Sequence, residues 1–500
     1  MGGPLSHVDA AWLRMEDRTN LMMVTGILVF EEPLDHRRVR SLLEKRLLVF
    51  DRFRQRVVGA PLGIGSPRWA EDEKFDIDAH LHQVALPAPG DQAALQLLVG
   101  DLMSTPLDMS KPLWQFHLVE GYRGGGRAEA SPSTAGRRVL SPQIKGGSVL
   151  LVRLHHCIAD GIALIQVLLS LTDPSARPGR VTGFRTPVAA PAGSWLSAPL
   201  GAVGSLLANP LELVELAQGG ISIADTLRRL VLLPPDPKTV LKGRLGVSKR
   251  AAWSEMVPLK NIKAAGVRHG ATINDILISA VAGALRDYLE ERGEPIDELE
   301  IRAAVPVNLR PIERGLELGN SFGLVFVPLP ISISDSLERL AALKVRMDNI
   351  KASSEAIVSF GVLTAVGIVP RQLHPPAIDF FGSKASLVMT NVPGPKELLY
   401  LAGRQITNCM FWVPMSGHLG LGISILSYAG EVMVGVAADA GLVPDPGRIV
   451  GAFERELRGL MMPASQRRGE KTGERKRPLS NPGRPRRRAR AARGLASPGE

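Results

Sequence analysis

The chain has 500 residues, more than one ordinary domain holds, so two or three domains are expected. Hydrophobic residues make up 45% of the chain and charged residues 22%, a balance that excludes wholesale disorder. The formal net charge of +11 comes mainly from residues 464–500, which hold 12 basic and 3 acidic side chains against 48 and 46 in the other 463 residues, so the body of the chain is nearly neutral.

The first segment, residues 1–171, alternates short apolar runs with stretches of helical spacing. Apolar and β-branched runs bounded by breakers predict strands at Val24–Phe30, Leu113–Val119 and Val149–Leu154. Apolar positions at helical spacing predict helices at Val39–Phe50 and Ala93–Met103. This segment is therefore predicted to be one mixed α/β unit, with a polar, Gly/Ser/Pro-rich surface insertion at Gly124–Gly147.

Residues 172–250 have a different composition, rich in Pro, Gly, Ala and Ser, which predicts a long crossover that carries helices. An amphipathic pattern covers Pro210–Leu233. Two interpretations stand side by side here. Either the amphipathic helix contacts a partner or lipid, or the segment is a linker whose helices pack on the core.

The second unit, residues 251–463, repeats the α+β pattern, and residues 464–500 form a low-complexity basic tail that is predicted to be disordered. A helix is predicted at Thr272–Arg292, because Thr272 can cap it and Asp275 completes a capping box. The other predicted elements are strands at Glu300–Leu309, Ser321–Leu329, Ala385–Thr390, Gln405–Val413, Leu419–Leu426 and Val432–Ala437, a hairpin turn at Tyr428-Ala429-Gly430 and a closing helix at Pro446–Leu460. The predicted fold class is α/β (α+β), with two similar halves and a site in the cleft between them.

Cellular location can also be addressed from the sequence. Two cysteines, Cys157 and Cys409, are too few for a disulfide framework and are typical of a reducing compartment. The first residues lack the basic region and apolar stretch of a signal peptide. The uncharged stretches Ala356–Pro370 and Thr186–Leu211 are respectively too short and too rich in proline to span a bilayer. We therefore expect a cytoplasmic protein, soluble or peripherally bound to a membrane.

One stretch gathers residues that carry chemistry: the strand ending at Leu154 is followed by His155-His156-Cys157-Ile158-Ala159-Asp160-Gly161 and then by an apolar helix. A strand directs its last residues toward a cleft, and the glycine lets the chain turn into the helix. Because side chains alternate along an extended chain, one histidine can face the cleft while the other supports it.

Other interpretations of this stretch remain open. The histidine pair could be structural, or it could ligate zinc with Asp160, although the sequence has no second cluster with ligand spacing and Cys409 stands alone. Cys157 could be an acyl-accepting nucleophile. Its side chain should point away from the face that His156 uses, which favours a thiol in the core.

The stretch resembles the HHxxxDG motif of CoA-dependent acyltransferases with the chloramphenicol-acetyltransferase-like fold, a superfamily that includes the condensation domains of peptide synthetases, and it matches at every fixed position. Over about residues 5–460, further segments resemble the bacterial wax ester synthase/diacylglycerol acyltransferase family, although His7 replaces that family's usual proline. The matching segments are Leu5-Ser6-His7-Val8-Asp9 with Trp12, Leu13 and Glu16, Pro112-Leu113-Trp114, Asn274-Asp275, Pro306-Val307-Asn308-Leu309-Arg310 and Asn391-Val392-Pro393-Gly394-Pro395.

The resemblance implies two chloramphenicol-acetyltransferase-like domains of mixed sheet plus helices, joined by a long helical crossover, with an active-site channel between them. His156 would be the general base that removes the proton of an acceptor hydroxyl, whose oxygen attacks the thioester carbonyl of acyl-CoA without an acyl-enzyme. His155 would hold the geometry of the loop. Asp160 would be structural and pair with an arginine, for which Arg310 is the candidate.

The resemblance also implies a set of substrate-binding residues. Asn274, near the start of its helix, could donate a hydrogen bond toward the developing oxyanion or the acceptor. Two plainer interpretations compete, since Asn274 and Asp275 could simply begin a helix and Leu113 and Trp114 could simply pack beneath a strand. The implied set is Gly161, Asn274, Asp275, Pro112, Leu113 and Trp114.

The function implied is acyl transfer from long-chain acyl-CoA to diacylglycerol or a fatty alcohol at the surface of a membrane or lipid droplet. Acyl-CoA is a substrate, and neither a cofactor nor a metal is expected. Acyl transfer to another alcohol or amine, and a non-catalytic lipid-surface protein, are the alternatives. The basic tail could bind anionic lipid or, non-specifically, nucleic acid, or it could have no role.

Overall fold

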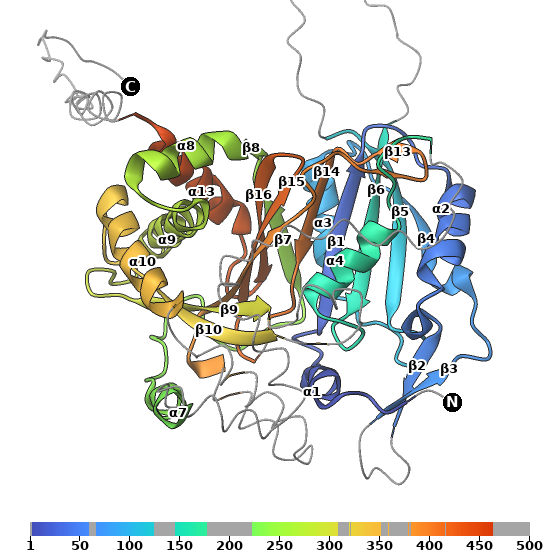
Figure 1. Ribbon diagram of the computed structural model, residues 1–500, viewed down its shortest axis with the longest axis horizontal. Coiled ribbons are helices and arrows are strands. Elements are labelled where there is room, and N and C mark those ends of the chain that lie inside the picture. The colour runs from blue at the N-terminus through green and yellow to red at the C-terminus, as the bar shows by residue number, and fades with distance from the viewer. Residues whose placement is uncertain are drawn as a thin grey trace, which may run out of the picture. The chain divides into compact units, whose positions relative to one another are not determined.

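Two large β-sheets with helices packed against them make up most of the described part of the chain (Figure 1). The computed structural model describes residues 3–59, 67–124, 146–177, 223–308, 320, 322–351, 359, 379, 382–415 and 417–463. The core of the predicted insertion, the basic tail and most of the predicted crossover therefore lie outside the described residues.

The first sheet has five strands in the order β14-β1-β6-β5-β4. Its strands are β1 (Met23–Phe30), β4 (Leu81–Ala85), β5 (Trp114–Tyr122), β6 (Gly147–His155) and β14 (Asn408–Trp412). β6 is buried along its whole length, because helix α4 (Gly161–Ser170) packs on one face of the sheet and helix α3 (Gln92–Met103) on the other. The positions of β1, β5 and β6 confirm the predicted strands Val24–Phe30, Leu113–Val119 and Val149–Leu154.

The second sheet has seven strands, six of them in the order β10-β9-β11-β15-β16-β7, with β8 paired to β16. Its strands are β7 (Lys249–Trp253), β8 (Val257–Pro258), β9 (Ile301–Asn308), β10 (Phe322–Leu329), β11 (Leu387–Pro393), β15 (Leu421–Tyr428) and β16 (Glu431–Asp439). Residues Tyr428 and Glu431 close the predicted hairpin between β15 and β16.

Four helices pack on the second sheet: α8 (Leu259–His269), α9 (Ile273–Glu291), α10 (Ser336–Lys351) and α13 (Pro446–Met461). In Figure 1, α9 lies between α10 and α13. Thr272 and Asp275 form the predicted capping box at the start of α9, each side chain accepting a hydrogen bond from the backbone of the other. Nearly the whole of α9 is buried, so it forms the centre of this core.

Shorter elements complete the described chain. They are α1 (His7–Met15), α2 (His36–Leu42) with a π-helical turn at Leu43–Leu47, α7 (Ile223–Leu232), the 3-10 turns Asp51–Phe53 and Ile77–Ala79, and two small hairpins, β2 (Gln55–Val58) with β3 (Arg68–Glu71) and β12 (Tyr400–Leu401) with β13 (Arg404–Gln405). The predicted helix Val39–Phe50 is thus shorter than expected, since its second half is a π-helical turn. The predicted strand Gln405–Val413 is two strands, because the chain bends between β13 and β14.

β14 crosses from the second part of the sequence into the first sheet. It pairs antiparallel with β1, in a register that runs from Thr25 opposite Trp412 to Val29 opposite Asn408. The next strand along the chain, β15, belongs to the second sheet. The indoles of Trp253 and Trp412 lie 5.5 Å apart where the two sheets approach. The second part of the sequence therefore contributes a strand to the first sheet, and the two sheets are linked by the chain between β14 and β15 and by side-chain packing.

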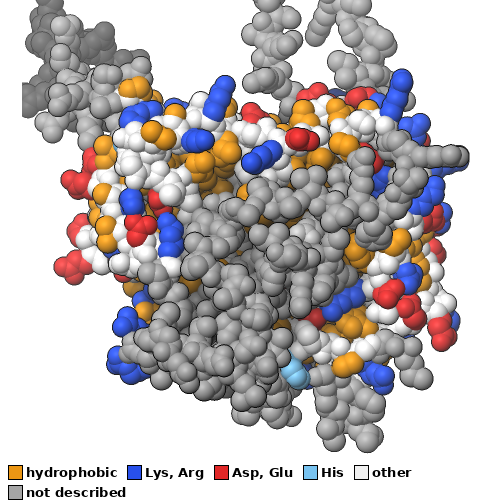
Figure 2. All heavy atoms as spheres, viewed as in Figure 1, with side chains coloured by type: hydrophobic (Ala, Val, Ile, Leu, Met, Phe, Trp, Pro, Cys, Tyr) orange, Lys and Arg blue, Asp and Glu red, His pale blue; other side chains and the backbone are white. Residues whose placement is uncertain are grey.

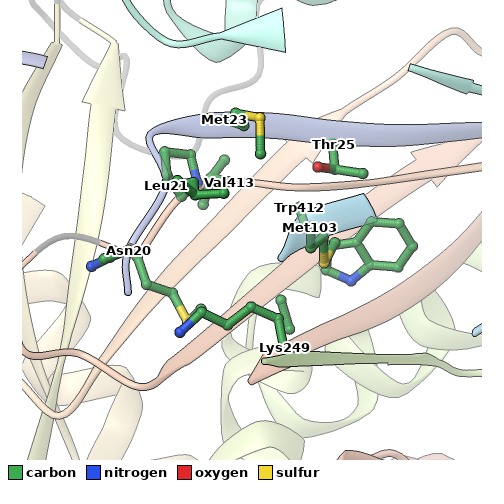
Figure 3. Close-up of a pocket in the computed structure, with 11 residues that line it drawn as sticks. Asn20, Leu21, Met23, Thr25, Met103, Lys249, Trp412 and Val413 are labelled. Atoms are coloured by element: carbon green, nitrogen blue, oxygen red, sulfur yellow. The ribbon is translucent and has the colours of Figure 1, made fainter. Parts of the chain in front are cut away.

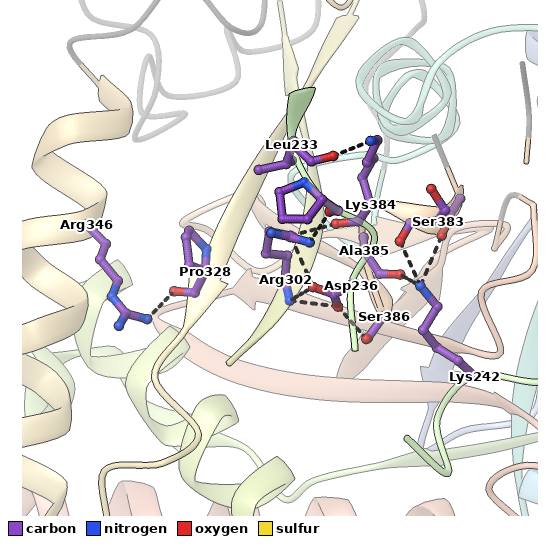
Figure 4. Close-up of polar contacts among 12 residues, drawn as sticks. Leu233, Asp236, Lys242, Arg302, Pro328, Arg346, Ser383, Lys384, Ala385 and Ser386 are labelled. Atoms are coloured by element: carbon purple, nitrogen blue, oxygen red, sulfur yellow. Dashed lines mark hydrogen bonds and ion pairs between the residues drawn. The ribbon is translucent and has the colours of Figure 1, made fainter. Parts of the chain in front are cut away.

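The end of the predicted crossover is tied to the second sheet by buried polar contacts (Figure 4). The carboxylate of Asp236 accepts the backbone N–H of Arg302 at 3.0 and 3.1 Å and the hydroxyl of Ser386 at 2.5 Å. The Arg302 guanidinium lies 3.0 Å from the same carboxylate. A buried charge is stable only when it is paired and hydrogen-bonded, so these contacts hold the segment after α7 against β9 and β11.

The described surface mixes both signs of charge. On the face shown in Figure 2, Lys and Arg side chains are interspersed with Asp and Glu, as expected for a nearly neutral body. Among the described helices, none combines the length and apolarity needed to cross a bilayer. The face shown in Figure 2 therefore has no cluster of one charge that would mark a site. The site is located from the HHxxxDG stretch instead.

Candidate active site

The HHxxxDG stretch lies where β6 ends and α4 begins, as predicted. His155 is the last residue of β6, and Gly161 is the first residue of α4. The side chain of Asp160 caps the helix by accepting the backbone N–H of Ala163 at 2.9 Å. Residues 155–161, called the HHxxxDG loop below, therefore have both ends anchored in regular structure.

His155 is fully buried and held at both ring nitrogens. Its Nδ1 accepts the backbone N–H of Cys157 at 3.0 Å, and its Nε2 lies 2.9 Å from Oε2 of Glu16. Because Nδ1 accepts a hydrogen bond, the ring proton is on Nε2, facing the carboxylate. Glu16 also accepts the backbone N–H of Met22 at 3.1 Å. These contacts give His155 a supporting role in the loop.

His156 has a ring nitrogen without a hydrogen-bond partner among the described residues. Its ring is 5% exposed and stacks on the indole of Trp12, with ring centres 4.3 Å apart, while Phe322 lies 5.8 Å away. That ring nitrogen is Nδ1, which is buried. Burial, the largest cause, lowers the pKa of His156 from 6.5 to about 4. The imidazole is therefore neutral at pH 7 and able to accept a proton.

A buried polar cluster holds the loop from below. The carboxylate of Asp9 accepts the side-chain amide of Asn320 at 2.7 Å and lies 3.2 Å from Arg52. Asn320 also donates to the carbonyl oxygen of His156 at 2.9 Å, and Arg52 donates to that of Ile158 at 2.5 Å. None of Asp9, Arg52 and Asn320 was predicted as a site residue. Only the match of residues 5–16 to the family's opening pointed toward this region.

Asn274 lies in the first turn of α9, buried at 5% exposure. Its side-chain oxygen accepts the amide of Asn391 at 2.6 Å, while its Nδ2 has no partner among the described residues. Asp275 accepts the backbone N–H of Thr272 at 2.9 Å within the capping box. Asn274 thus presents an unused donor, whereas the contact of Asp275 is the one expected of a helix start.

The Pro112-Leu113-Trp114 segment is buried beneath the loop. Trp114 has no exposed surface, donates its indole N–H to the carbonyl oxygen of Phe53 at 2.8 Å and stacks on His80 at 4.4 Å. The carbonyl oxygen of Leu113 accepts the backbone N–H of His155 at 2.9 Å. These contacts are those of core packing, the plainer of the two sequence interpretations, and they support the strand that carries His155.

Two further interpretations of the HHxxxDG stretch concern the predicted arginine partner of Asp160 and the alternative of a zinc site. Arg310 lies outside the described residues, so the predicted pair with Asp160 lies outside them as well. Within the described ranges, no three His, Cys, Asp or Glu side chains gather as a metal site requires. Cys157 is fully buried, as a core thiol would be.

A pocket lies where the two sheets meet (Figure 3). Met23 and Thr25 of β1, Met103 of α3 and Trp412 of β14 line it together with Lys249, whose ammonium lies 2.8 Å from Asp439. Met23 is directly opposite His155 in the pairing of β1 with β6. The pocket therefore begins one strand away from the HHxxxDG loop, and most of the residues that line it are apolar.

Comparison with known families gives a match over most of the chain. The sequence model of the wax ester synthase/diacylglycerol acyltransferase catalytic domain matches residues 5–129 and 145–277. The model of the WS/DGAT C-terminal domain matches residues 318–461. The interruption at 130–144 falls inside the predicted insertion Gly124–Gly147.

Individual proteins give the same picture. A protein of Mycobacterium tuberculosis H37Rv named as a probable diacylglycerol O-acyltransferase is 28% identical over 479 residues, which cover 93% of this chain and 97% of its own. The solved wax ester synthase/diacylglycerol acyltransferase of Marinobacter aquaeolei superposes with a TM-score of 0.64 at 22% identity, over 92% of this chain and 98% of the other.

A condensation domain has the same fold. The first condensation domain of the calcium-dependent antibiotic synthetase superposes with a TM-score of 0.57 at 14% identity, over 92% of this chain and 96% of the other. These likenesses confirm the predicted two-domain, chloramphenicol-acetyltransferase-like fold.

Proposed function

Because the chain belongs to the wax ester synthase/diacylglycerol acyltransferase family, we propose that it is an O-acyltransferase. It moves a long-chain acyl group from acyl-CoA to diacylglycerol, which yields triacylglycerol, or to a long-chain alcohol, which yields a wax ester. The observation that carries the proposal is the buried, neutral imidazole of His156 at the end of β6, in an intact HHxxxDG loop. A neutral imidazole is the form that a general base requires.

His156 begins the reaction by accepting the proton of the acceptor hydroxyl. The hydroxyl oxygen then attacks the thioester carbonyl carbon of acyl-CoA, and a tetrahedral intermediate forms. As this intermediate collapses, the new ester C–O bond remains and the C–S bond breaks. The departing thiolate takes the proton from the imidazolium of His156, which returns to its neutral form as CoA leaves.

The unused Nδ2 of Asn274 is the proposed donor to the developing oxyanion. Asn391 occupies the side-chain oxygen of Asn274 at 2.6 Å, and this contact leaves the amide nitrogen as the end available to a ligand. A donor held in place before the reaction stabilises charge that appears only in the transition state. No cofactor takes part in these steps, since acyl-CoA supplies both the acyl group and the leaving group.

The proposed substrates dissolve in membranes, so the enzyme is proposed to work at the surface of a membrane or lipid droplet without spanning it. The described end of α7 supports this placement. Arg228 and Arg229 are exposed there beside Val231 and Leu232, which are 51% and 66% exposed. Exposed apolar side chains next to basic ones are typical of helices that lie in the interface plane.

The test is an acyl-transfer assay with radiolabelled palmitoyl-CoA, in which diacylglycerol and hexadecanol are offered separately. Wild type is expected to label triacylglycerol or wax ester, and His156→Ala is expected to lose turnover while its circular dichroism stays unchanged. His82→Ala is the matched control, because His82 is a half-buried histidine of the same sheet that contacts His117 instead of the loop. A well-folded wild type that labels neither lipid, or a fully active His156→Ala variant, would overturn the proposal.

A further inference from the structure

Two distant segments each contribute a pair of side chains around His156. Helix α1 provides Asp9 and Trp12. The second pair is Asn320, two residues before β10, and Phe322, the first residue of β10. In each pair, the polar residue belongs to the cluster beneath the loop and the aromatic residue lies beside the imidazole. Asp9 and Asn320 are 311 residues apart in the sequence. The surroundings of His156 are therefore completed only when these two segments meet.

Asn320 is the residue that joins them. Its side-chain nitrogen donates to Oδ1 of Asp9 at 2.7 Å and to the carbonyl oxygen of His156 at 2.9 Å. Its backbone N–H donates to the same Oδ1 at 3.2 Å. A primary amide has two N–H donors on one nitrogen, and both are used here. A carboxylate at this position would offer no donor, and a hydroxyl would offer only one.

The buried carboxylate of Asp9 makes this arrangement specific. Asp9 has no exposed surface, so its charge requires partners, which Arg52 supplies at 3.2 Å and Asn320 supplies with two hydrogen bonds. Arg52 lies over the ring of Trp69 at 5.1 Å and donates to the carbonyl oxygen of Ile158. One carboxylate thus ties the loop backbone at two places, through Asn320 at residue 156 and through Arg52 at residue 158.

We propose that Asn320 is a positioning residue, which sets the backbone and ring orientation of His156 only when the start of β10 is seated against α1. The proposal rests on the proposed function, in which His156 is the base. Its consequence is that residues from both parts of the sequence control the activity of one histidine. A displacement of the base by about 1 Å lowers rates by about 10²-fold, so the two hydrogen bonds of Asn320 should appear in kcat.

The experiment compares kcat and KM for palmitoyl-CoA in Asn320→Ala, in Asn320→Asp and in the exchange Asp9→Asn with Asn320→Asp. In the exchange, the amide at position 9 can donate to the carboxylate at position 320, which restores their hydrogen bond, but the carbonyl oxygen of His156 still lacks its donor. We expect Asn320→Ala to lose about 10²-fold in kcat with KM nearly unchanged. We expect the exchange to recover only part of the melting temperature lost in Asn320→Asp, because it removes the repulsion between two buried carboxylates but also the charge that pairs with Arg52, and we expect no recovery of kcat.

The matched control is Asn408→Asp. Asn408 lies on β14 opposite Val29, six residues along β1 from Met23, which is opposite His155, a separation of roughly 20 Å. Wild-type kcat is expected for this variant. If the exchange restored stability and kcat to the same extent, the positioning role would be wrong, because a purely structural contact predicts that parallel recovery. A kcat within about twofold of wild type in Asn320→Ala would also contradict the positioning role.

A second readout does not depend on turnover. In protein labelled with ¹⁵N-histidine, the ring signals of His156 are identified by their absence from His156→Ala. Asn320→Ala is expected to shift these signals at pH 7, and Asn408→Asp is expected to leave them in place. If wild type acylates neither acceptor, the proposed function fails, while the ring signals still decide the positioning role. Unchanged signals in Asn320→Ala would overturn that role.

Discussion

Oε2 of Glu16 lies 2.9 Å from Nε2 of His155, a contact that joins the end of α1 to the last residue of β6. The same oxygen accepts the backbone N–H of Met22, so one carboxylate holds both the strand entering the first sheet and the first histidine of the loop. His155 thereby directs the chain so that His156, the next residue, stacks on Trp12.

Removing this acceptor should destabilise the protein. Glu16→Leu leaves the buried Nε2–H of His155 without a partner, and we expect a loss of about 1–3 kcal/mol in the free energy of unfolding, measured with urea. Glu16→Gln keeps an acceptor oxygen and should lose clearly less. The exposed Glu73→Gln serves as the control. An unchanged unfolding free energy in Glu16→Leu would show that the contact contributes nothing.

The low pKa of His156 should appear in the pH dependence of stability. Its pKa is about 4 in the folded chain against 6.5 in the unfolded chain, so the unfolded chain binds the proton first as the pH falls. Stability is therefore fully present above pH 6.5 and is lost progressively down to about pH 4, by up to about 3 kcal/mol. His156→Ala should flatten this part of the stability curve.

His117 provides the comparison for this measurement. Burial, followed by Arg153, lowers its pKa to about 3, so His117→Gln should also reduce the loss of stability between pH 6.5 and 3. Because His117 is not part of the proposed mechanism, acyl transfer should survive that change. Identical pH curves for wild type and His156→Ala would mean that the folded chain does not disfavour protonation of His156.

Asn391 should control the orientation of Asn274. Asn391→Asp replaces the donor with a carboxylate that can only accept, so the amide of Asn274 should turn its nitrogen toward position 391. Since the loss of one oxyanion donor lowers kcat by about 10²–10³-fold, a decrease of that order is expected, with a smaller one in Asn391→Ala. Steady-state assays of both variants, with Asn408→Asp alongside, test this. Wild-type kcat in both variants would remove Asn274 from the chemistry.

The cap formed by Asp160 should be measurable as stability. Asp160→Ala removes the acceptor of the Ala163 N–H and should lower the free energy of unfolding by about 1 kcal/mol, within the range of 0.5–2 kcal/mol known for helix caps. Asp160→Asn and Asp160→Ser retain a capping oxygen and should lose less. Thermal melts and acyl-transfer rates are compared for the three variants. A large loss of rate without any loss of stability would place Asp160 in the chemistry instead.

Local features were predictable because they depend on neighbours in the chain. The strand that becomes β6, the turn at Gly161 and the capping box of Thr272 and Asp275 are all written in the spacing of apolar, capping and turn residues. The same holds for the hairpin between β15 and β16. Helices α8 and α10 and strand β7 were not predicted, and these are elements whose burial depends on the rest of the second sheet.

The site shows the same division. The sequence by itself determined the HHxxxDG stretch and its place between a strand and a helix, because these follow from about ten adjacent residues. The role of His156 as base is what the resemblance to the family implies. Only the tertiary structure decided that Trp12 and Phe322 flank the imidazole, that Glu16 holds His155 and that Asn320 ties the loop to Asp9. These contacts join residues up to 311 positions apart in the sequence. Bringing such distant residues together depends on the packing of the two sheets and the exclusion of water. A contact of this kind leaves no periodic pattern in the sequence from which it could be predicted.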